Sequence, residues 1–390
     1  MKTTYDTIVL GCGGLGSGTV YWLARRAGAE VLGLEQFELG HVHGGSQDHS
    51  RIIRLTYHHA DYTRLTPHTY SAWATLEEES AVRVVTQTGS VELALKDGPH
   101  QADIENYAQA MAAAAIPYER FGGDEVMRRY PQFRLNQEVD ALWQESTGIA
   151  DAAKGNAAHV ATARLHGATI LDRCPVRAIR PFAGGVEVES ERGTFSCRRL
   201  IVTAGAWTDR VLADVGVNLS LTATQEQVTY YATPNLKEFA IGRFPIFIWH
   251  GANVFYGFPV YGEVATKAAI DASGPAVTPE TRTYEADPVR EQRLESWLAE
   301  HIPGFLGPKL YSKTCLYAMP KDRNFVIDSL PETPQIIVCS GAGHAYKFAG
   351  LLGKILSQLA LDGQTDYPIA PFSLNRPAIT DPTYQAAFHM

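Results

Sequence analysis

The chain has 390 residues, of which 45% are apolar, and it carries a formal net charge of −8. This length predicts about two domains, each large enough to bury a core of its own. The acidic balance, without a cluster of Lys and Arg, excludes a nucleic-acid partner, because such binding needs a basic surface.

Membrane, disulfide and metal-binding proteins are also disfavoured. The first residues are polar, and no run approaches the roughly 18 apolar residues of a membrane span. We therefore expect a soluble, cytoplasmic protein without membrane contact. The five cysteines are widely spaced and include no C-x-x-C pair, so neither a disulfide framework nor a metal site is expected.

The first predicted elements form a dinucleotide-binding unit. Residues 7–10 predict a strand, 15–26 a helix and 31–34 a second strand, and a glycine-rich turn at 11–16 joins the first strand to the helix. An acidic residue, Glu35, ends the second strand about 20 residues beyond the turn, where such sites bind a ribose hydroxyl. The motif alone leaves NAD and FAD open, since both contain ADP.

The three glycines of the motif have separate expected roles. Gly11 allows the tight turn, Gly13 lets the backbone approach a pyrophosphate, and Gly16 lets the helix pack closely on the strand. The pyrophosphate would lie at the start of the helix, where unpaired N–H groups favour an anion.

The rest of the chain predicts a second kind of sheet. Helices are expected at residues 69–78, 103–113, 123–129 and 349–361, and strands at 176–179, 185–189, 194–197, 200–203, 225–231, 245–249, 254–258, 264–270 and 336–339. The four strands between 225 and 270 have no helices between them, which is typical of an antiparallel sheet. Cys315 is expected in a polar turn shortly before a second glycine turn at 341–343.

These patterns predict an α/β protein whose second domain is of the α+β class. Residues 1–85, 145–220 and 310–390 would form a discontinuous, Rossmann-type cofactor domain. Residues 86–144 and 221–309 would form the inserted antiparallel-sheet domain that binds the substrate.

Several short motifs, in order along the chain, resemble those of one known family. They are Gly44-Gly45-Ser46, Ser50-Arg51-Ile52-Ile53-Arg54, Thr203-Ala204-Gly205-Ala206-Trp207, Tyr256-Gly257-Phe258-Pro259, Cys315-Leu316-Tyr317 and Gly343-His344-Ala345-Tyr346-Lys347-Phe348. Together they resemble the monomeric sarcosine oxidase family, which includes N-methyltryptophan oxidase and L-pipecolate oxidase, among the D-amino-acid-oxidase-like FAD-dependent oxidoreductases. The similarity extends from Asp6 to about Asn375.

The resemblance implies a monomeric flavoprotein oxidase. FAD would be joined through its 8α-methyl carbon to the sulfur of Cys315; from the residues alone, a cysteine in a polar turn is more often a bystander. A secondary amino acid, N-alkyl or cyclic, would be oxidised to an imine, and oxygen would be reduced to hydrogen peroxide. Expected FAD contacts are Gly11, Gly13, Gly14, Leu15, Gly16, Glu35, Gln36, Ser46, Arg51, Val176, Gly205, Trp207, Cys315, Gly341, Gly343, His344 and Lys347.

Four cations have expected roles near the flavin. Arg54 and Lys347 match the positions that hold the substrate carboxylate, which a guanidinium with a nearby ammonium does well; alternatively, Arg54 caps a surface strand. Arg51 would stabilise negative charge on reduced flavin. Lys267 would lower the barrier for making superoxide from oxygen, unless it is an ordinary solvated charge on a strand edge.

Four further residues would line the substrate side. Tyr256, Tyr317 and Ile248 are expected around the substrate, although the two tyrosines could equally belong to a core. His344 would face the flavin or serve as a hydrogen-bonded structural residue. No base is required, because a neutral secondary amine can transfer a hydride directly to flavin.

Two positions depart from the family pattern. Gln47 and Asp271 stand where sarcosine-oxidising members carry histidines, so both are expected to contact the substrate. His49 replaces the first histidine only with a small shift in alignment. An acid such as Asp271 would favour a protonated amine or attract a second cation. We therefore expect a cyclic or larger N-substituted amino acid to be oxidised at least as readily as sarcosine. The alternatives are an FAD dehydrogenase with another electron acceptor and a flavin-binding protein without catalysis.

Overall fold

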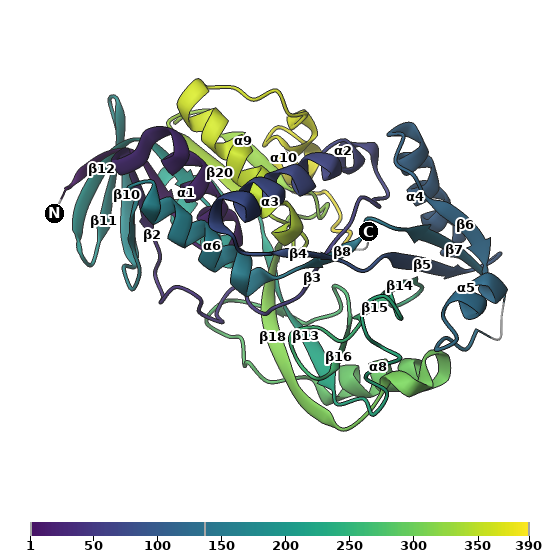
Figure 1. The fold of residues 1–390 in the computed structure, drawn as a ribbon. Helices are drawn as coiled ribbons and strands as arrows, with labels where there is room; N and C mark the ends of the chain where they lie inside the picture. Colours follow the sequence, from purple (N-terminus) through teal and green to yellow (C-terminus); the bar gives the residue numbers. More distant parts are fainter. Residues whose placement is uncertain (1, 136–137, 389–390) are drawn as a thin grey trace.

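The computed structural model describes residues 2–135 and 138–388, which form a mixed sheet with a parallel centre and a mainly antiparallel sheet, with helices around them (Figure 1). An eight-stranded sheet contains β1 (Thr4–Leu10), β2 (Val31–Leu34), β9 (Thr169–Leu171), β10 (Val176–Phe182), β11 (Gly185–Ser190), β12 (Gly193–Val202), β19 (Val326–Ser329) and β20 (Ile336–Ser340). Strands β9, β2, β1, β12 and β20 are parallel neighbours in that order, which is the arrangement expected of a Rossmann-type domain.

The second sheet has nine strands and is antiparallel except where β14 pairs with β5. Its strands are β5 (Ser90–Leu95), β6 (Glu119–Gly122), β7 (Val139–Gln144), β13 (Thr222–Tyr231), β14 (Ile246–His250), β15 (Phe255–Phe258), β16 (Thr266–Ile270), β17 (Ala276–Val277) and β18 (Lys309–Met319). A three-stranded sheet of β3 (Arg51–Ile53), β8 (Gly148–Ala150) and β4 (Val85–Gln87) lies near the centre of the molecule in Figure 1.

Ten α-helices are present in the described residues. They are α1 (Gly14–Ala27), α2 (Ala60–Thr63), α3 (Thr66–Ser80), α4 (Gln101–Ala113), α5 (Gly123–Arg129), α6 (Ala152–Leu165), α7 (Thr208–Leu212), α8 (Pro288–His301), α9 (Ala349–Asp362) and α10 (Pro377–Thr380). Helix α1 packs against α6 and α9, and α3 packs against α9. Within residues 2–135 and 138–388, no helix combines the length and apolar character needed to span a membrane.

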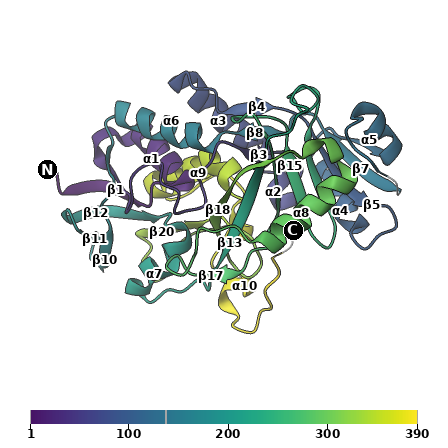
Figure 2. The ribbon, with the colours of Figure 1, turned by 90° about the horizontal axis from the view of Figure 1, so that it is seen from below.

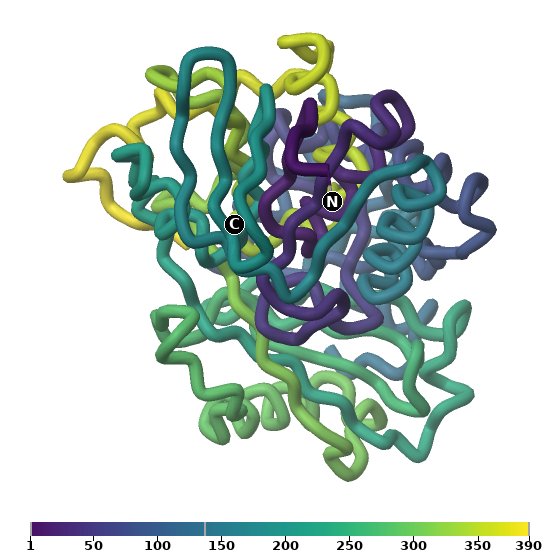
Figure 3. Tube along the Cα trace, turned by 90° about the vertical axis from the view of Figure 1, so that its left-hand side faces the viewer, coloured from purple at the N-terminus to yellow at the C-terminus, as the bar shows by residue number. Residues whose placement is uncertain are grey.

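Segments from both ends of the chain build the parallel sheet. Figure 3 shows the N-terminal and C-terminal segments together in the upper part of the molecule and the green segment of the chain below them. This agrees with the predicted fold class. The predicted domain boundaries stay a prediction, and β18, which begins close to residue 310, pairs along its whole length with β13 of the nine-stranded sheet (Figure 2).

Most predicted elements are confirmed, with a few differences. The segments 194–197 and 200–203 form one strand, β12, because it pairs continuously with β1. The prediction missed helices α2, α6, α7, α8 and α10 and strands β3–β9 and β17–β19. Cys315 was expected in a polar turn, but it lies in the middle of β18. Polar residues are accommodated in this strand because its two lysines have ion-pair partners, Glu291 for Lys309 and Asp48 for Lys313.

The two faces of the nine-stranded sheet have different surroundings. Phe247, Trp249, Phe255 and Ile270 pack on one face with Trp297 of α8 in an apolar core. Residues one position away along the same strands point to the opposite face, because strand side chains alternate. The register pairs Cys315 with Glu226, Lys267 with Phe258 and Tyr230, and Ile248 with Tyr256 and Glu92. The sheet therefore collects these side chains on its other face.

Candidate active site

A cavity of about 690 Å³ extends from the parallel sheet to this polar face of the antiparallel sheet. Its lining includes Glu35 and Gln36 at the end of β2, the glycine turn that begins α1, Cys315 on β18, and Lys347 before α9. The volume lies within the range of cofactor and ligand sites. Segments that are far apart in the sequence thus share one elongated cavity.

The glycine turn forms a bare backbone wall at one end. Gly11 has φ of 89°, and a Cβ on Gly16 would lie only 1.7 Å from the carbonyl oxygen of Gly11, so the helix lies directly against the turn. Gly16 accordingly does not line the cavity, whereas Gly11, Gly13 and Gly14 do. Helix α1 carries no acidic residue in its first turn, so its N-terminus can accept an anion.

Glu35 is fixed beside this turn. Its Oε2 accepts a hydrogen bond from Cys12 N (2.8 Å), and its Oε1 accepts one from Phe37 N (3.0 Å). Burial would raise the pKa of Glu35, but His41 and these backbone bonds lower it, so the side chain is a carboxylate. Its remaining lone pairs can accept ribose hydroxyls.

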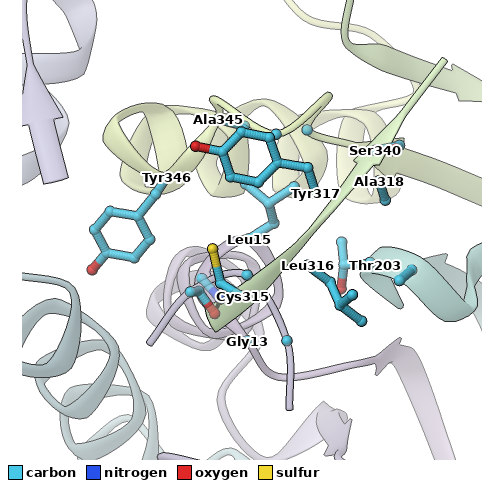
Figure 4. A pocket seen from close by; sticks show the side chains of 18 of the residues that line it. Gly13, Leu15, Thr203, Cys315, Leu316, Tyr317, Ala318, Ser340, Ala345 and Tyr346 are labelled. Atoms are coloured by element: carbon cyan, nitrogen blue, oxygen red, sulfur yellow. Dashed lines mark hydrogen bonds between the residues drawn. The ribbon is translucent and has the colours of Figure 1, made fainter. Parts of the chain in front are cut away.

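Cys315 lines the cavity from β18. Figure 4 shows its sulfur projecting from β18 on the same strand as Tyr317, with the turn residue Gly13 and the helix residue Leu15 nearby in the view. Cys315 is 8% exposed, and burial raises the pKa of its thiol, while Arg51 acts in the opposite direction. The sulfur is thus accessible to a ligand in the cavity.

Lys267 lies in the cavity wall near Cys315. It is 3% exposed, which excludes the alternative of a solvated edge charge. Its Nζ donates to Asp48 Oδ2 (2.8 Å), to Ser50 O (2.9 Å) and to Ser50 Oγ (2.9 Å). Burial lowers the pKa of Lys267 to about 8, and the Asp48 charge opposes that shift. Arg51 also lines the cavity, with its guanidinium donating to Ser50 O and Gly45 O.

Arg54 belongs to a buried ion pair at the far end of the cavity. It is 6% exposed, so it does not cap a surface strand. Its Nη1 lies 2.5 Å from Glu92 Oε1, and the other oxygen of Glu92 lies 2.8 Å from His250 Nε2. Burial opposes the charged form of Glu92, but Arg54 and His250 lower its pKa. Glu92 is therefore an anion that holds the guanidinium in place.

A second ion pair joins Asp271 to a residue that was not predicted. Arg323 Nη2 donates to Asp271 Oδ2 (2.7 Å), and Tyr317 OH donates to Oδ1 (3.4 Å). Burial opposes ionisation of Asp271, but the Arg323 charge lowers its pKa. The second cation expected beside Asp271 is thus a side chain of the protein itself.

Lys347 differs from these arginines in its partners. Among the described residues, its Nζ donates to two neutral oxygens, Tyr57 OH (3.0 Å) and His344 O (2.9 Å). Burial lowers the pKa of Lys347 well below its usual value, and Arg54 lowers it further. His344 is buried between Tyr57 OH and Arg323 O, and burial lowers its pKa as well, so it is a neutral, hydrogen-bonded residue.

The structure brings nearly all predicted site residues to this cavity. Besides those described above, the lining includes Leu15, Gln36, Ser46, Val176, Gly205, Trp207, Ile248, Tyr256, Gly341 and Gly343. Gln47 is an exception, because its amide turns away and donates to Thr314 O. His49 does not line the cavity either.

Sequence reasoning missed the charged partners. Asp48, Glu92 and Arg323 contact the predicted cations and acids, and Tyr57 contacts Lys347. An acid inside the apolar strand Ser90–Leu95 was a usable signal for Glu92, since a buried charge needs a partner.

The cavity fits FAD. Gly205 lines it with φ of 56°, and a Cβ there would meet no atom within 4 Å, so bare backbone faces open space. The start of α1 suits a pyrophosphate, Glu35 suits a ribose, and the buried cations lie farther along the same cavity. These features define an oxidoreductase with a dinucleotide cofactor.

Comparison with known proteins identifies the family. The family model described as FAD dependent oxidoreductase (DAO) matches residues 6–359, so the chain belongs to this family. Monomeric sarcosine oxidase from Streptomyces avermitilis is 31% identical over 96% of this chain and 98% of its own length. Monomeric sarcosine oxidase from Bacillus sp. strain B-0618 is 29% identical over 98% of both chains.

A solved structure supports the same fold. The open form of NikD, described as an unusual amino acid oxidase, superposes with a TM-score of 0.83 at 27% identity, covering 95% of this chain and 98% of NikD. The protein is thus an FAD-dependent oxidoreductase.

Proposed function

We propose that the protein oxidises a secondary amino acid, N-alkyl or cyclic, to an imine and reduces oxygen to hydrogen peroxide. The observation that carries this proposal is the charge balance at the far end of the cavity. Arg54 faces the buried carboxylate of Glu92 and Arg323 faces that of the partly buried Asp271, whereas Lys347 bonds only neutral oxygens among the described residues. A lysine without an acidic partner suits a substrate with one carboxylate, which would supply the missing negative charge. The similarity to sarcosine oxidases supports the same substrate class.

The chemistry balances as amine plus oxygen giving imine plus hydrogen peroxide. FAD, when bound, accepts the two electrons released from the substrate CH–NH group. The N-terminus of α1 and Glu35 would hold its ADP half, and the sulfur of Cys315 would hold the flavin covalently. The residues of the chain then have two tasks, which are to orient the substrate and to keep its amine neutral.

Arg54 and Lys347, which we call the carboxylate clamp, would orient the substrate. Arg54 is prearranged by Glu92, and Lys347 is held by Tyr57 OH and His344 O. A bound carboxylate would offset the burial that lowers the pKa of Lys347 and would restore its charge. The clamp would therefore bind the substrate with uptake of a proton by Lys347.

The two arginine pairs perform the second task. Because Glu92 and Asp271 are already neutralised by Arg54 and Arg323, neither carboxylate is free to stabilise a substrate ammonium. Nearby positive charges also lower the pKa of an amine. The substrate nitrogen would therefore be bound unprotonated, with the lone pair that imine formation requires.

Covalent attachment is tested with Cys315→Ser. We expect acid precipitation of the parent protein to leave a yellow pellet, with the flavin on the peptide that contains Cys315. The variant should release its flavin to the supernatant, because serine is a poor nucleophile without an activating base. Flavin release from the parent, or retention by the variant, would contradict the covalent bond.

Substrate preference is tested with a steady-state series of sarcosine, N-methyl amino acids, proline, pipecolate and fructosyl amino acids. We expect kcat/KM for a cyclic or larger N-substituted amino acid to equal or exceed that for sarcosine. The reason is that Asp271 and Arg323 replace a neutral donor beside the substrate by an ion pair. A clear preference for sarcosine would refute this expectation.

A further inference from the structure

Asp48 is a buried acid that the proposed chemistry does not yet use. Its side chain is 2% exposed and does not line the cavity. Its Oδ2 accepts hydrogen bonds from Lys267 Nζ and Tyr230 OH, both at 2.8 Å, and its Oδ1 accepts one from Lys313 Nζ at 3.1 Å. Arg51 Nη1 lies 3.8 Å from Oδ2. One carboxylate therefore joins the cations on β16 and β18 to the loop before β3.

The backbone conformation of Asp48 is unusual. Its φ is 81°, a left-handed value that costs energy for a residue with a side chain. The conformation is held because Asp48 O also accepts a hydrogen bond from Ala153 N at the start of α6. This conformation places the Asp48 carboxylate against Lys267. Glycine would adopt the same backbone conformation without strain but would supply no carboxylate.

The contacts of Lys267 leave its ammonium little freedom. An ammonium has three N–H groups, and three acceptors from two neighbouring residues surround this one: Asp48 Oδ2, Ser50 O and Ser50 Oγ. Phe258 and Tyr230 cover it, with Nζ 4.9 and 5.5 Å from their ring centroids. The three hydrogen bonds and the two aromatic rings therefore hold the ammonium in one position.

We propose that Asp48 is a positioning residue whose carboxylate fixes the Lys267 ammonium at the cavity wall and preserves its charge for the reaction with oxygen. This inference rests on the proposed role of Lys267 in that reaction. Asp48 is itself an anion, since burial opposes its ionisation but Lys267 and Arg51 lower its pKa. It is the acid that balances three cations, namely Lys267, Lys313 and Arg51.

Other titratable groups near Lys267 bear on its pH dependence. Arg51 favours the neutral form of Lys267. Cys315 carries no charge in the holoenzyme when its sulfur is bonded to the flavin. His49 lies 3.5 Å from Asp48, and burial lowers its pKa, so it is neutral at physiological pH. Because Asp48 is the acid in direct contact with the ammonium, its removal should have the largest effect.

The charge of Lys267 is measured by NMR of the holoenzyme with ¹³Cε-labelled lysine, and the signal is assigned by its absence from Lys267→Met. We expect Asp48→Asn to lower the pKa of Lys267 by about 1 to 3 units, as loss of an adjacent opposite charge does. Asp48→Glu should recover part of the difference. Lys313→Met should act in the opposite direction, because it removes a cation that shares the carboxylate. An unchanged pKa in Asp48→Asn would overturn the proposal.

The oxygen reaction is measured by mixing anaerobically reduced enzyme with oxygen across a pH series. In Asp48→Asn we expect the rate constant near neutral pH to fall about tenfold and to recover as pH is lowered, because the Lys267 charge returns below its shifted pKa. Reduction by substrate should change little. A uniform loss at all pH values would indicate a merely structural role and would overturn the inference.

Two further variants separate the possible failures. Asp48→Gly suits the left-handed backbone and removes the carboxylate, so it should fold and repeat the result of Asp48→Asn. Asp362→Asn, which breaks an exposed pair with Arg26, is the matched control and should leave both measurements unchanged. If Lys267→Met leaves the oxygen reaction unchanged, the proposed role of Lys267 fails. If Lys267→Met slows it but the Asp48 variants do not, only the role of Asp48 fails.

Discussion

Replacing Lys267 with methionine is expected to lower the rate constant for the reaction of the reduced enzyme with oxygen by about 100- to 1000-fold. The ammonium is buried, and its position is fixed by Asp48 and Ser50, so it would stabilise a developing superoxide anion without reorganisation. Methionine has similar length and no charge. For the parent enzyme, the rate should fall as pH rises through about 8, where Lys267 loses its proton.

The effect should be confined to one half of the reaction. Stopped-flow measurement of reduction by the amino acid under anaerobic conditions should give nearly the same rate in the variant and the parent. Lys96→Met is the matched control, because it removes a lysine from an exposed pair with Glu138. An unchanged oxygen rate in Lys267→Met would favour a dehydrogenase that passes its electrons to another acceptor.

Replacing Arg54 with lysine is expected to raise KM for the amino acid by about 10- to 100-fold. Lysine preserves a positive charge for Glu92 and so avoids leaving a buried acid unpaired, which would cost about 3–5 kcal/mol. It cannot reproduce the planar fork of the guanidinium, which binds the neighbouring carboxylates of Glu92 and the substrate in fixed directions. Steady-state kinetics at saturating oxygen would measure the change.

Substrate analogues distinguish loss of the clamp from a general disturbance. The carboxamide of the same amino acid has no charge for the clamp to bind, so the parent and Arg54→Lys should oxidise it with similar KM. Arg120→Lys, which alters an exposed arginine paired with Glu105 and Asp140, should behave as the parent. Equal losses with the amino acid and its carboxamide would show that Arg54 does not bind the carboxylate.

The parts of the fold that depend on local pattern were predictable from the sequence. The strand, glycine turn and helix at the N-terminus follow from apolar periodicity and from the close approach that Gly16 permits. The position of Cys315 was predicted wrongly because it, too, was inferred from local pattern alone. The polar residues of β18 indicate a turn when read locally, but in the structure the whole strand pairs with β13, and its residues from Cys315 to Ala318 line the cavity.

The partners of the site residues were not predictable, because they are distant in the sequence. Glu92 is 38 residues from Arg54, and Asp48 is 219 residues from Lys267. No periodicity connects such pairs; only the register of the sheet and the path of the loop before β3 bring them together. Gln47 illustrates the converse, since its motif position predicted a substrate contact while its side chain bonds Thr314.

The most direct test of the proposed oxidase is an anaerobic titration of the purified yellow protein with the secondary amino acids named above. We predict that at least one of them bleaches the visible flavin band at one equivalent per flavin, and that oxygen then restores the band with one equivalent of hydrogen peroxide. No bleaching by any secondary amino acid, or bleaching that oxygen does not reverse, would contradict the account.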